Sequence, residues 1–221
     1  MSNYTNNSTD QRPIILPTPF KEGGKTLLEA LQLRRTERGI SSKEIPLQIL
    51  SNLLWAVFGV NRTKSAFNKP GRTAPSASNS QEIDLYVRLK ENTYLYEAKH
   101  HSLKPVKTGD HLRKNGRWLT NQGTGDAPLD IIYVADLSRY DLGPNQPDPH
   151  IGDSEVQKSY YYTDTGFIAQ NVYLYAASEG LAAWFHNCDK VTIRKVLGLN
   201  DDQLVLFVHS IGYPRQDELT S

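Results

Sequence analysis

The stretch that decides the fold is residues 164–181, which read DTGFIAQNVYLYAASEGL. Asp164 is a residue type that often caps the start of a helix, and Gly180 is one that often ends a helix. Three alanines, at positions 169, 176 and 177, are small enough to allow close helix packing. The sequence therefore predicts a long, closely packed helix from about Asp164 to Glu179.

Outward from this helix, helical and strand patterns are mixed without a regular strand–helix–strand alternation, which favours an α+β fold. A leucine stripe predicts a first helix and a wide apolar face predicts a second, core helix. The expected helices are Thr26 to about Arg35, Pro46 to Phe58, and Thr192 to Leu197. The expected strands are Ile83–Leu89, Tyr94–Glu97, Ile131–Ala135 and Leu204–Val208.

The domain organisation is simple, because 221 residues suit one core rather than two. Residues 1–24 are expected to form an extended N-terminal arm, since prolines at positions 13, 17 and 19 keep the chain extended. Its apolar part should lie on the body or on a partner subunit. Residues 25–221 form the single domain, with a long polar loop over residues 61–82 of the kind that tends to be functional.

Composition excludes several classes of function. The net charge of +1, from 25 Lys and Arg against 24 Asp and Glu, gives no electrostatic case for nucleic acid or an anionic membrane. Cys188 is the one cysteine, so an internal disulfide and a cysteine metal cluster are excluded. No apolar run approaches the ~20 residues of a membrane span, and residues 1–10 lack signal-peptide features. We expect a cytoplasmic protein.

The first motif is Arg34-Arg35-Thr36-Glu37-Arg38. Three guanidinium groups and a hydroxyl can clamp a phosphate with charge-assisted hydrogen bonds. Arg34 and Arg38 would share a face if the helix continued. A basic helix end that complements the helix dipole explains the same residues, so this motif alone does not decide.

Three more motifs are individually weak. Residues 74–81, APSASNSQ, offer small polar groups suited to a planar heteroaromatic ring, although a polar turn before a strand has the same composition. Residues 178–183 place Gly180 at a chain reversal, for which a helix stop is sufficient explanation. Residues 212–215, GYPR, could present Arg215 to an anion or simply leave it on the surface.

Several alternatives lack their signatures. The six histidines show no metal-binding spacing on a helix, so no metal site is expected. The chain has no G-x-S-x-G hydrolase elbow, no G-x-G-x-x-G and no Walker A motif. If NAD(P)H is used, it is not held by a Rossmann fingerprint.

Taken together in this order and spacing, the four motifs resemble the nitroreductase family of flavoproteins over about residues 26–216. The segment from Tyr94 through His101-Ser102-Leu103 to Gly109-Asp110 is similar to the subgroup that contains the peptide thiazoline and oxazoline dehydrogenases. The resemblance implies a mostly antiparallel sheet packed by helices, and an intertwined homodimer with two FMN sites at its interface.

The resemblance also implies roles for particular residues. The FMN phosphate and ribityl chain would be bound by Arg34, Arg35, Thr36, Arg38 and Arg215. The ring would be reached from the other subunit by Pro75, Ser76, Ser78 and Asn79, and its N5 side would be lined by Glu179, Gly180 and Leu181. No side chain is named as catalytic, because the flavin itself carries hydride at N5.

Two positions depart from the family pattern. Thr36 stands where the family often has Ser, which keeps the hydroxyl. Glu82-Ile83 follow Gln81 where the family often has Pro-Trp, which affects the substrate side of the pocket.

Three functions remain open at this stage. The main hypothesis is an FMN-dependent reductase that passes electrons from NAD(P)H to nitroaromatics, quinones or another small acceptor. The second is a flavin-dependent dehydrogenase of a peptide-like or other small substrate that needs no nicotinamide. The third is a flavin-binding storage or regulatory protein.

Overall fold

The computed structural model describes residues 12–65, 69–89, 92–107, 127–140, 142–143 and 148–215, together with the backbone of 113–114 and 117–118. Its sheet is built around β9 (Leu129–Asp136), in which seven of eight residues are buried. Because β9 is rich in β-branched and aromatic residues, it suits a strand covered on both faces. β4 (Ile83–Leu89) and β11 (Gln203–Gly212) pair with it on either side, both antiparallel.

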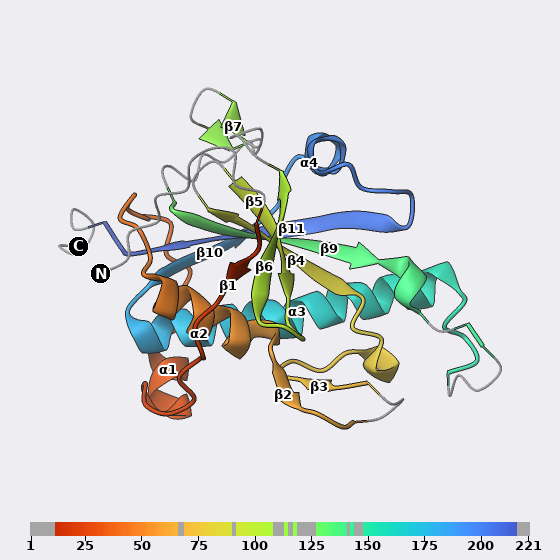
Figure 1. Cartoon of the computed structure of the whole chain (residues 1–221), viewed down its shortest axis with the longest axis horizontal. Helices are drawn as coiled ribbons and strands as arrows, with labels where there is room; N and C mark the ends of the chain where they lie inside the picture. Colours follow the sequence, from red (N-terminus) through yellow and green to blue (C-terminus); the bar gives the residue numbers. More distant parts are fainter. Residues whose placement is uncertain are drawn as a thin grey trace.

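The sheet has seven strands within the described residues, and every pairing is antiparallel (Figure 1). Their order is β1 (Ile14–Ile15), β6 (Ser102–Lys107), β5 (Asn92–Glu97), β4, β9, β11 and β10 (Ala182–His186). Outside it lie the short pairs β2 (Val60–Arg62) with β3 (Gly71–Arg72), and β7 (Arg113–Lys114) with β8 (Arg117–Trp118). Two 3-10 turns are η2 (Ala77–Asn79) and η3 (Leu137–Arg139).

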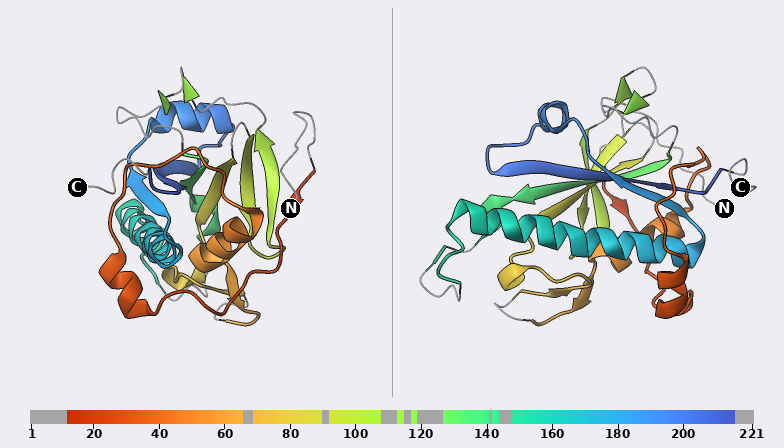
Figure 2. Two further views of the ribbon diagram at one scale, coloured as in Figure 1. Left: turned by 90° about the vertical axis from the view of Figure 1, so that its left-hand side faces the viewer. Right: turned by 180° about the vertical axis from the view of Figure 1, so that it is seen from behind.

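Helices cover both faces of this sheet (Figure 2). α2 (Leu47–Phe58) and α3 (Ser154–Glu179) pack together on one face, over the larger apolar core. α4 (Lys190–Leu197) covers the other face through a smaller cluster that includes Ile132, Ile193 and Val208. The expected α+β fold, a mostly antiparallel sheet packed by helices, is thus confirmed. Among the described helices, none has the length and apolar character to cross a membrane.

The prediction that Asp164 caps the long helix is wrong. α3 begins ten residues earlier, at Ser154, and Asp153 caps it by accepting from the backbone N–H groups of Glu155 and Val156. Asp164 lies within the helix and its side chain is buried. It accepts a hydrogen bond from the backbone N–H of Ala77, which belongs to the loop before β4. The predicted end was right, since Gly180 takes the left-handed conformation at the C-cap.

The first helix is shorter than expected. α1 (Leu27–Leu33) starts with a capping box between Thr26 and Glu29. It ends before the arginine cluster, with Arg34 as C-cap. Arg34 and Arg38 therefore do not share a helix face, because the chain between them is extended and follows β10. The sequence patterns also did not predict β10 or β6.

The arm is attached to the body by named contacts. Ile14 and Ile15 pair with Leu103 and Ser102 at the edge of the sheet, and Leu16 is buried. Further along, the Lys25 N–H donates to Ser178 Oγ at 2.8 Å. The expectation that part of the apolar stretch lies on the body is therefore met by Leu16, while Ile15 and Phe20 keep exposed side chains.

A row of buried polar side chains crosses four strands. Arg88 on β4 pairs with Asp130 on β9, with Nε donating to Oδ2 at 2.6 Å. Ser210 on β11 donates to Asp130 Oδ1 at 2.5 Å and contacts His186 Nε2 on β10 at 3.1 Å. The row fixes the lateral register of the strands, since each group needs its neighbour to satisfy buried hydrogen bonds.

We predict that Asp130→Asn destabilises the protein by about 3–5 kcal/mol, because it leaves the Arg88 guanidinium buried without its counter-charge. Asp201→Asn is the matched control, since it breaks an exposed pair with Arg194 and should cost about 0–1 kcal/mol. Urea unfolding of the three proteins measures both values. Equal stabilities would show that the buried pair does not hold the sheet.

Candidate functional site

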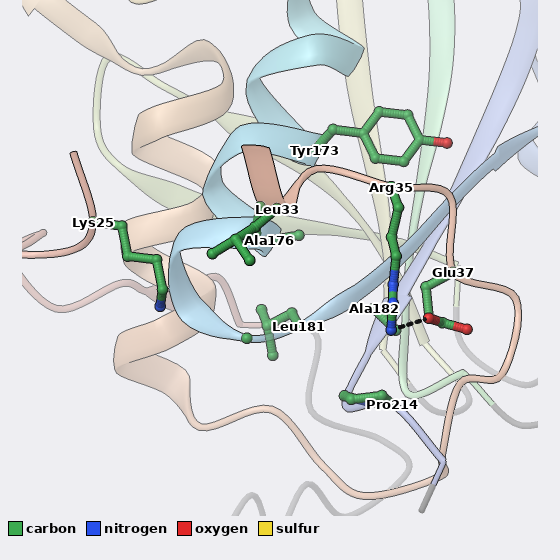
Figure 3. A pocket seen from close by; sticks show the side chains of 11 residues that line it. Lys25, Leu33, Arg35, Glu37, Tyr173, Ala176, Leu181, Ala182 and Pro214 are labelled. Atoms are coloured by element: carbon green, nitrogen blue, oxygen red, sulfur yellow. Dashed lines mark ion pairs between the residues drawn. The ribbon is translucent and has the colours of Figure 1, made fainter. Parts of the chain in front are cut away.

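A pocket of about 360 Å³ opens where the C-terminal end of α3 meets the end of α1 and the start of β10 (Figure 3). That volume is in the range of small-molecule sites. Its lining is partly apolar and partly charged. The residues are Lys25, Leu33, Arg35, Glu37, Tyr173, Ala176, Ala177, Gly180, Leu181, Ala182 and Pro214.

The floor of the pocket is the glycine turn at the end of α3. Gly180 has φ 70°, a left-handed conformation that a side chain would oppose. The N–H groups of Gly180 and Leu181 both donate to the Ala176 carbonyl, and the chain then reverses into β10. Gly180 and Leu181, predicted as site residues, therefore line this pocket. Glu179, also predicted, is the exposed last residue of α3.

The arginine cluster runs along the start of β10. The Glu37 N–H donates to the Ala183 carbonyl at 3.0 Å, which holds the segment against the strand. Thr36 Oγ1 lies 3.1 Å from the hydroxyl of Tyr173, which also accepts from the Phe185 N–H at 3.0 Å. Tyr173 thus ties the cluster, α3 and β10 together beside the pocket.

The charges of the cluster are arranged around this opening. Arg35 crosses the pocket and pairs with Glu37 at 2.9 Å (Figure 3). Arg34 and Arg38 lie over the rings of Tyr173 and Trp184, with Cζ 5.6 and 5.2 Å from the centroids. Arg35 is the one member of the cluster with an ion pair in the described part of the chain.

The C-terminal motif joins the same region. The Arg215 N–H donates to the Gly39 carbonyl at 2.8 Å, and Arg215 Nε donates to the Ile40 carbonyl at 3.1 Å. Pro214 lines the pocket itself. Three of the four sequence motifs therefore meet at one pocket, which Arg35 and Gly180 line; Arg34 lies over Tyr173, while Arg38 and Arg215 lie outside the lining. Such a set fits an elongated ligand that carries a phosphate and a flat apolar part.

The fourth motif lies elsewhere. The loop of Pro75, Ser76, Ser78 and Asn79 contacts the middle of α3, where the Ala77 N–H donates to Asp164 at 2.8 Å. Gly180 follows Asp164 by sixteen positions along the chain, which corresponds to about 24 Å of helix. Within one chain, the loop and the pocket cannot contact the same small ligand group.

The backbone of this loop is strained, however, as functional loops often are. Ser78, Asn79 and Gln81 all have positive φ, between 49° and 54°. Several hydrogen bonds hold the conformation, including the Gln81 N–H to Ser76 Oγ at 3.0 Å. The loop is therefore preorganised and offers its polar groups in a fixed arrangement.

Sequence reasoning missed several residues at or beside the pocket. Lys25 and Glu37 lie in its lining, Tyr173 bridges three elements, and Trp184 stacks beneath Arg38. Glu37 and Tyr173 lie within the sequence motifs, and this position was the signal that could have identified them as site residues. Lys25 reaches the site only because its side chain donates to the Ser178 carbonyl at 2.9 Å.

A buried histidine lies behind the pocket. The ring of His209 packs against Tyr173 with centroids 4.6 Å apart. Complete burial, with a smaller contribution from His186, lowers the pKa of His209 to about 3. It is therefore a neutral packing residue at physiological pH. Among the described residues, no group of three or more His, Cys, Asp or Glu is placed to hold a metal ion.

Comparisons with known proteins identify the family. The sequence pattern of the Nitroreductase family matches residues 31–213, most of the chain. A crystal structure from Ralstonia eutropha, provisionally described as a nitroreductase, is 31% identical and superimposes with a TM-score of 0.79. The match covers 96% of this chain and 93% of that one.

More distant structures share the fold. An NADPH:FMN oxidoreductase from Vibrio harveyi, solved with NAD⁺, is 18% identical with a TM-score of 0.59, over 86% of this chain and 69% of that chain. A chain of the Escherichia coli microcin synthetase complex, with truncated pro-MccB17 bound, is 15% identical with a TM-score of 0.64, over 98% and 85%. With three of its motifs gathered at one pocket and its sequence matched from residue 31 to 213, the chain belongs to the nitroreductase family of oxidoreductases.

Proposed function

We propose that this protein is an FMN-dependent oxidoreductase that uses NAD(P)H to reduce nitroaromatics, quinones or similar small acceptors. The observation that carries the proposal is the meeting of Arg35, Gly180 and Pro214 around one pocket, with Arg34 and Arg38 beside it. Family membership supports the reaction class. A cytoplasmic location fits a chain with one cysteine and a need for NAD(P)H.

Within this proposal the arginines hold the phosphate end of FMN. Arg34 and Arg38 keep their guanidinium planes over aromatic rings, which orients their N–H groups at little entropic cost. Arg35 would exchange its bond with Glu37 for the phosphate, and Arg215 would approach from the C-terminal turn. Thr36 offers its hydroxyl to the ribityl chain.

The glycine turn would hold the ring end. Gly180 lacks a side chain and Leu181 is apolar, so a flat ring can approach the end of α3 closely, with Glu179 at the rim. When bound, FMN supplies hydride transfer at N5, so the protein needs no nucleophile. The residues bind and orient the flavin, and they exclude water from one face of it.

We further propose that the protein is a homodimer in which each loop of Pro75, Ser76, Ser78 and Asn79 contacts the flavin of the other subunit. The loop is preorganised, yet it lies far along α3 from the pocket of its own chain. A second copy resolves this separation. The exposed leucines of α1 supply an apolar surface next to the pocket. They are Leu27, Leu28, Leu31 and Leu33, with exposed fractions of 47–72%.

The second candidate is a flavin-dependent dehydrogenase that oxidises a peptide-like or other small substrate without nicotinamide. The fold similarity over 98% of the chain to a chain of the microcin synthetase complex favours it, together with the segment from Tyr94 to Asp110. Residues 108–110 of that segment lie outside the described residues. The two candidates differ in the compound that reduces the bound flavin, which is NAD(P)H in the first and the substrate itself in the second.

The first prediction separates these candidates. Purified protein should carry FMN, and its flavin absorbance should bleach when NADH or NADPH is added without oxygen. Because one pocket must take nicotinamide and acceptor in turn, steady-state kinetics should be ping-pong with parallel double-reciprocal lines. Colourless protein that does not bind FMN at micromolar levels contradicts the flavin proposal. Flavin that neither nicotinamide bleaches favours the dehydrogenase, and flavin that is released readily without turnover favours a storage protein.

The second prediction concerns the phosphate end. Arg34→Glu or Arg38→Glu should weaken FMN binding by about tenfold to a hundredfold, since each charged hydrogen bond is worth about 1.5–3 kcal/mol. Lys104→Glu on β6 is the control, because Lys104 is exposed and lies outside the pocket lining. Fluorescence titration of apoprotein with FMN gives the dissociation constants of the wild type and of the three variants. If all variants bind equally, the cluster is an ordinary basic surface.

The third prediction concerns the dimer. Sedimentation at low micromolar concentration should give twice the chain mass of 24.9 kDa. Leu28→Asp should dissociate the dimer and release FMN, because it places a charge in an apolar interface. Val191→Asp on α4, an equally exposed apolar position, should do neither. A wild-type monomer that retains FMN would refute the dimer and the role of the loop.

A further inference from the structure

Two carboxyl groups are buried together between the loop of residues 75–81 and α3. Glu82 follows the loop directly and is completely buried, and Asp164 on α3 is 3% exposed. Each is tied to the loop. Ser80 Oγ donates to Glu82 Oε2 at 2.5 Å, and the Ala77 N–H donates to Asp164 Oδ2 at 2.8 Å. Glu82 stands at the position where the chain departs from the family's Pro-Trp pattern.

Within the described residues, one oxygen of this pair lacks a hydrogen-bond partner, and a proton carried by the pair would let one carboxyl donate to the other; the phenol of Tyr140 also lies within reach of Glu82. Glu82 Oε1 is buried and has no hydrogen-bond partner in the described structure. The Asp164 carboxyl is within hydrogen-bonding reach of Glu82. Two ionised carboxylates can only accept, whereas one protonated carboxyl can donate to the other. Burial, followed by the charge of Glu82, raises the pKa of Asp164 to about 7, while the Ala77 N–H acts in the opposite direction.

Nearby cations bind other acceptors. Arg139 donates to the Gln81 carbonyl and to Asp84, Arg72 donates to Gln81 Oε1, and Lys69 Nζ reaches the Ser80 carbonyl at 3.4 Å. Among the described residues, the other titratable groups acting on the pair are the phenols of Tyr140 and of Tyr160 on α3. Burial raises the pKa of Tyr140, and the charges of Glu82 and Asp164 raise it further, so these phenols stay neutral. Since the described cations nearby bind other acceptors, a proton is the charge that would offset the second carboxylate within the described residues.

The loop needs such an anchor because its backbone is strained. Ser78, Asn79 and Gln81 have positive φ, which costs about 1–2 kcal/mol for each residue other than glycine. The bonds from Ala77 to Asp164 and from Ser80 to Glu82 lie on either side of Ser78 and Asn79, and the second also spans Gln81. Repulsion between two carboxylates would separate these two anchor points.

We propose that Glu82 and Asp164 share one proton and act as a positioning pair, which holds the loop of residues 75–81 in the conformation that contacts the partner's flavin. This inference rests on the proposed function for its effect on flavin, but the shared proton can be measured without it. Loss of the proton leaves two adjacent charges, loosens the loop and weakens flavin binding. Through this pair, the affinity with which one subunit's loop binds the flavin of the other subunit depends on pH.

Stability should reveal the proton directly. The folded-state pKa of Asp164 lies above its ordinary value of 3.8, so the folded chain holds a proton that the unfolded chain releases. The contribution of the pair therefore declines as pH rises from about 4 to about 7, and it is lost above that range. Asp164→Asn should remove this decline. Its amide oxygen can accept from the Ala77 N–H, while its N–H₂ can donate to Glu82 at every pH.

The experiment measures melting temperature and FMN dissociation constant from pH 5 to 9 for wild type, Asp164→Asn and Asp164→Leu. Between the two ends of this range, the wild type should lose several degrees more than Asp164→Asn and bind FMN at least several-fold more weakly at the alkaline end. Asp164→Leu should be impaired at every pH, which makes the amide a rescue. Asp153→Asn on the same helix is the control, because Asn caps a helix as well as Asp.

The outcomes separate the claims. Parallel melting profiles of wild type and Asp164→Asn would overturn the shared proton, whether or not flavin binds. Divergent melting profiles with identical pH profiles for FMN binding would overturn the positioning role alone. A chain that binds no FMN at any pH contradicts the proposed function, while its melting profiles still test the pair. If Asp164→Asn does not fold, infrared spectra of the wild type decide, since a protonated-carboxyl band should be present at pH 5 and absent at pH 9.

Discussion

The rigidity of α3 is the constraint on which the rest of the structure depends. This one helix of 26 residues carries the glycine turn of the pocket at its end, Tyr173 about two turns before it, and Asp164 near its middle. A continuous helix has a fixed rise per residue, so these groups keep their separation whatever the loops do. The pocket and the preorganised loop are therefore held apart within a chain, which is the geometric argument for a site shared between two chains.

The sheet supports this helix and orients the cations around its end. β10 continues directly from the glycine turn, and the arginine segment follows β10 through the bond between Glu37 and Ala183. β10 in turn is held to β11, where Ser210 and His186 join the buried row that ends at Arg88. Displacement of these central strands would therefore also move the guanidinium groups of the arginine segment at residues 34–38.

Much of the fold could be predicted from local pattern. α2 and α4 have distinct apolar faces and glycine stops, and β4 alternates cleanly, so their bounds were close to correct. The start of α3 was missed because Ser154–Thr163 has no apolar stripe and Asp164 resembles a cap. β10 was missed because Ala182-Ala183 continues the composition of the preceding helix. Both errors arise where tertiary contacts, rather than periodicity, decide the structure.

The candidate site could likewise be predicted only in part. The motifs identified the arginines and the glycine turn, because residue type alone suggests their chemistry. They could not reveal that Tyr173 joins Thr36 to Phe185, or that Glu82 faces Asp164, since those partners are separated by 12 to 137 residues. Burial and missing hydrogen-bond partners become visible only when the chain is folded.

The N-terminal third of the chain also closes both sides of the sheet. An open strand edge exposes unpaired N–H and C=O groups and can recruit strands from other molecules. Ile14 and Ile15 cover β6, while Glu37 occupies the carbonyl of Ala183 on β10. The arm is fastened further by the Phe20 N–H, which donates to Asn52 at 2.9 Å. Proteolysis or deletion that released the segment from Ile14 to Glu37 would expose both strand edges on an otherwise intact core. This segment therefore protects the sheet against aggregation as well as forming part of the site's surroundings.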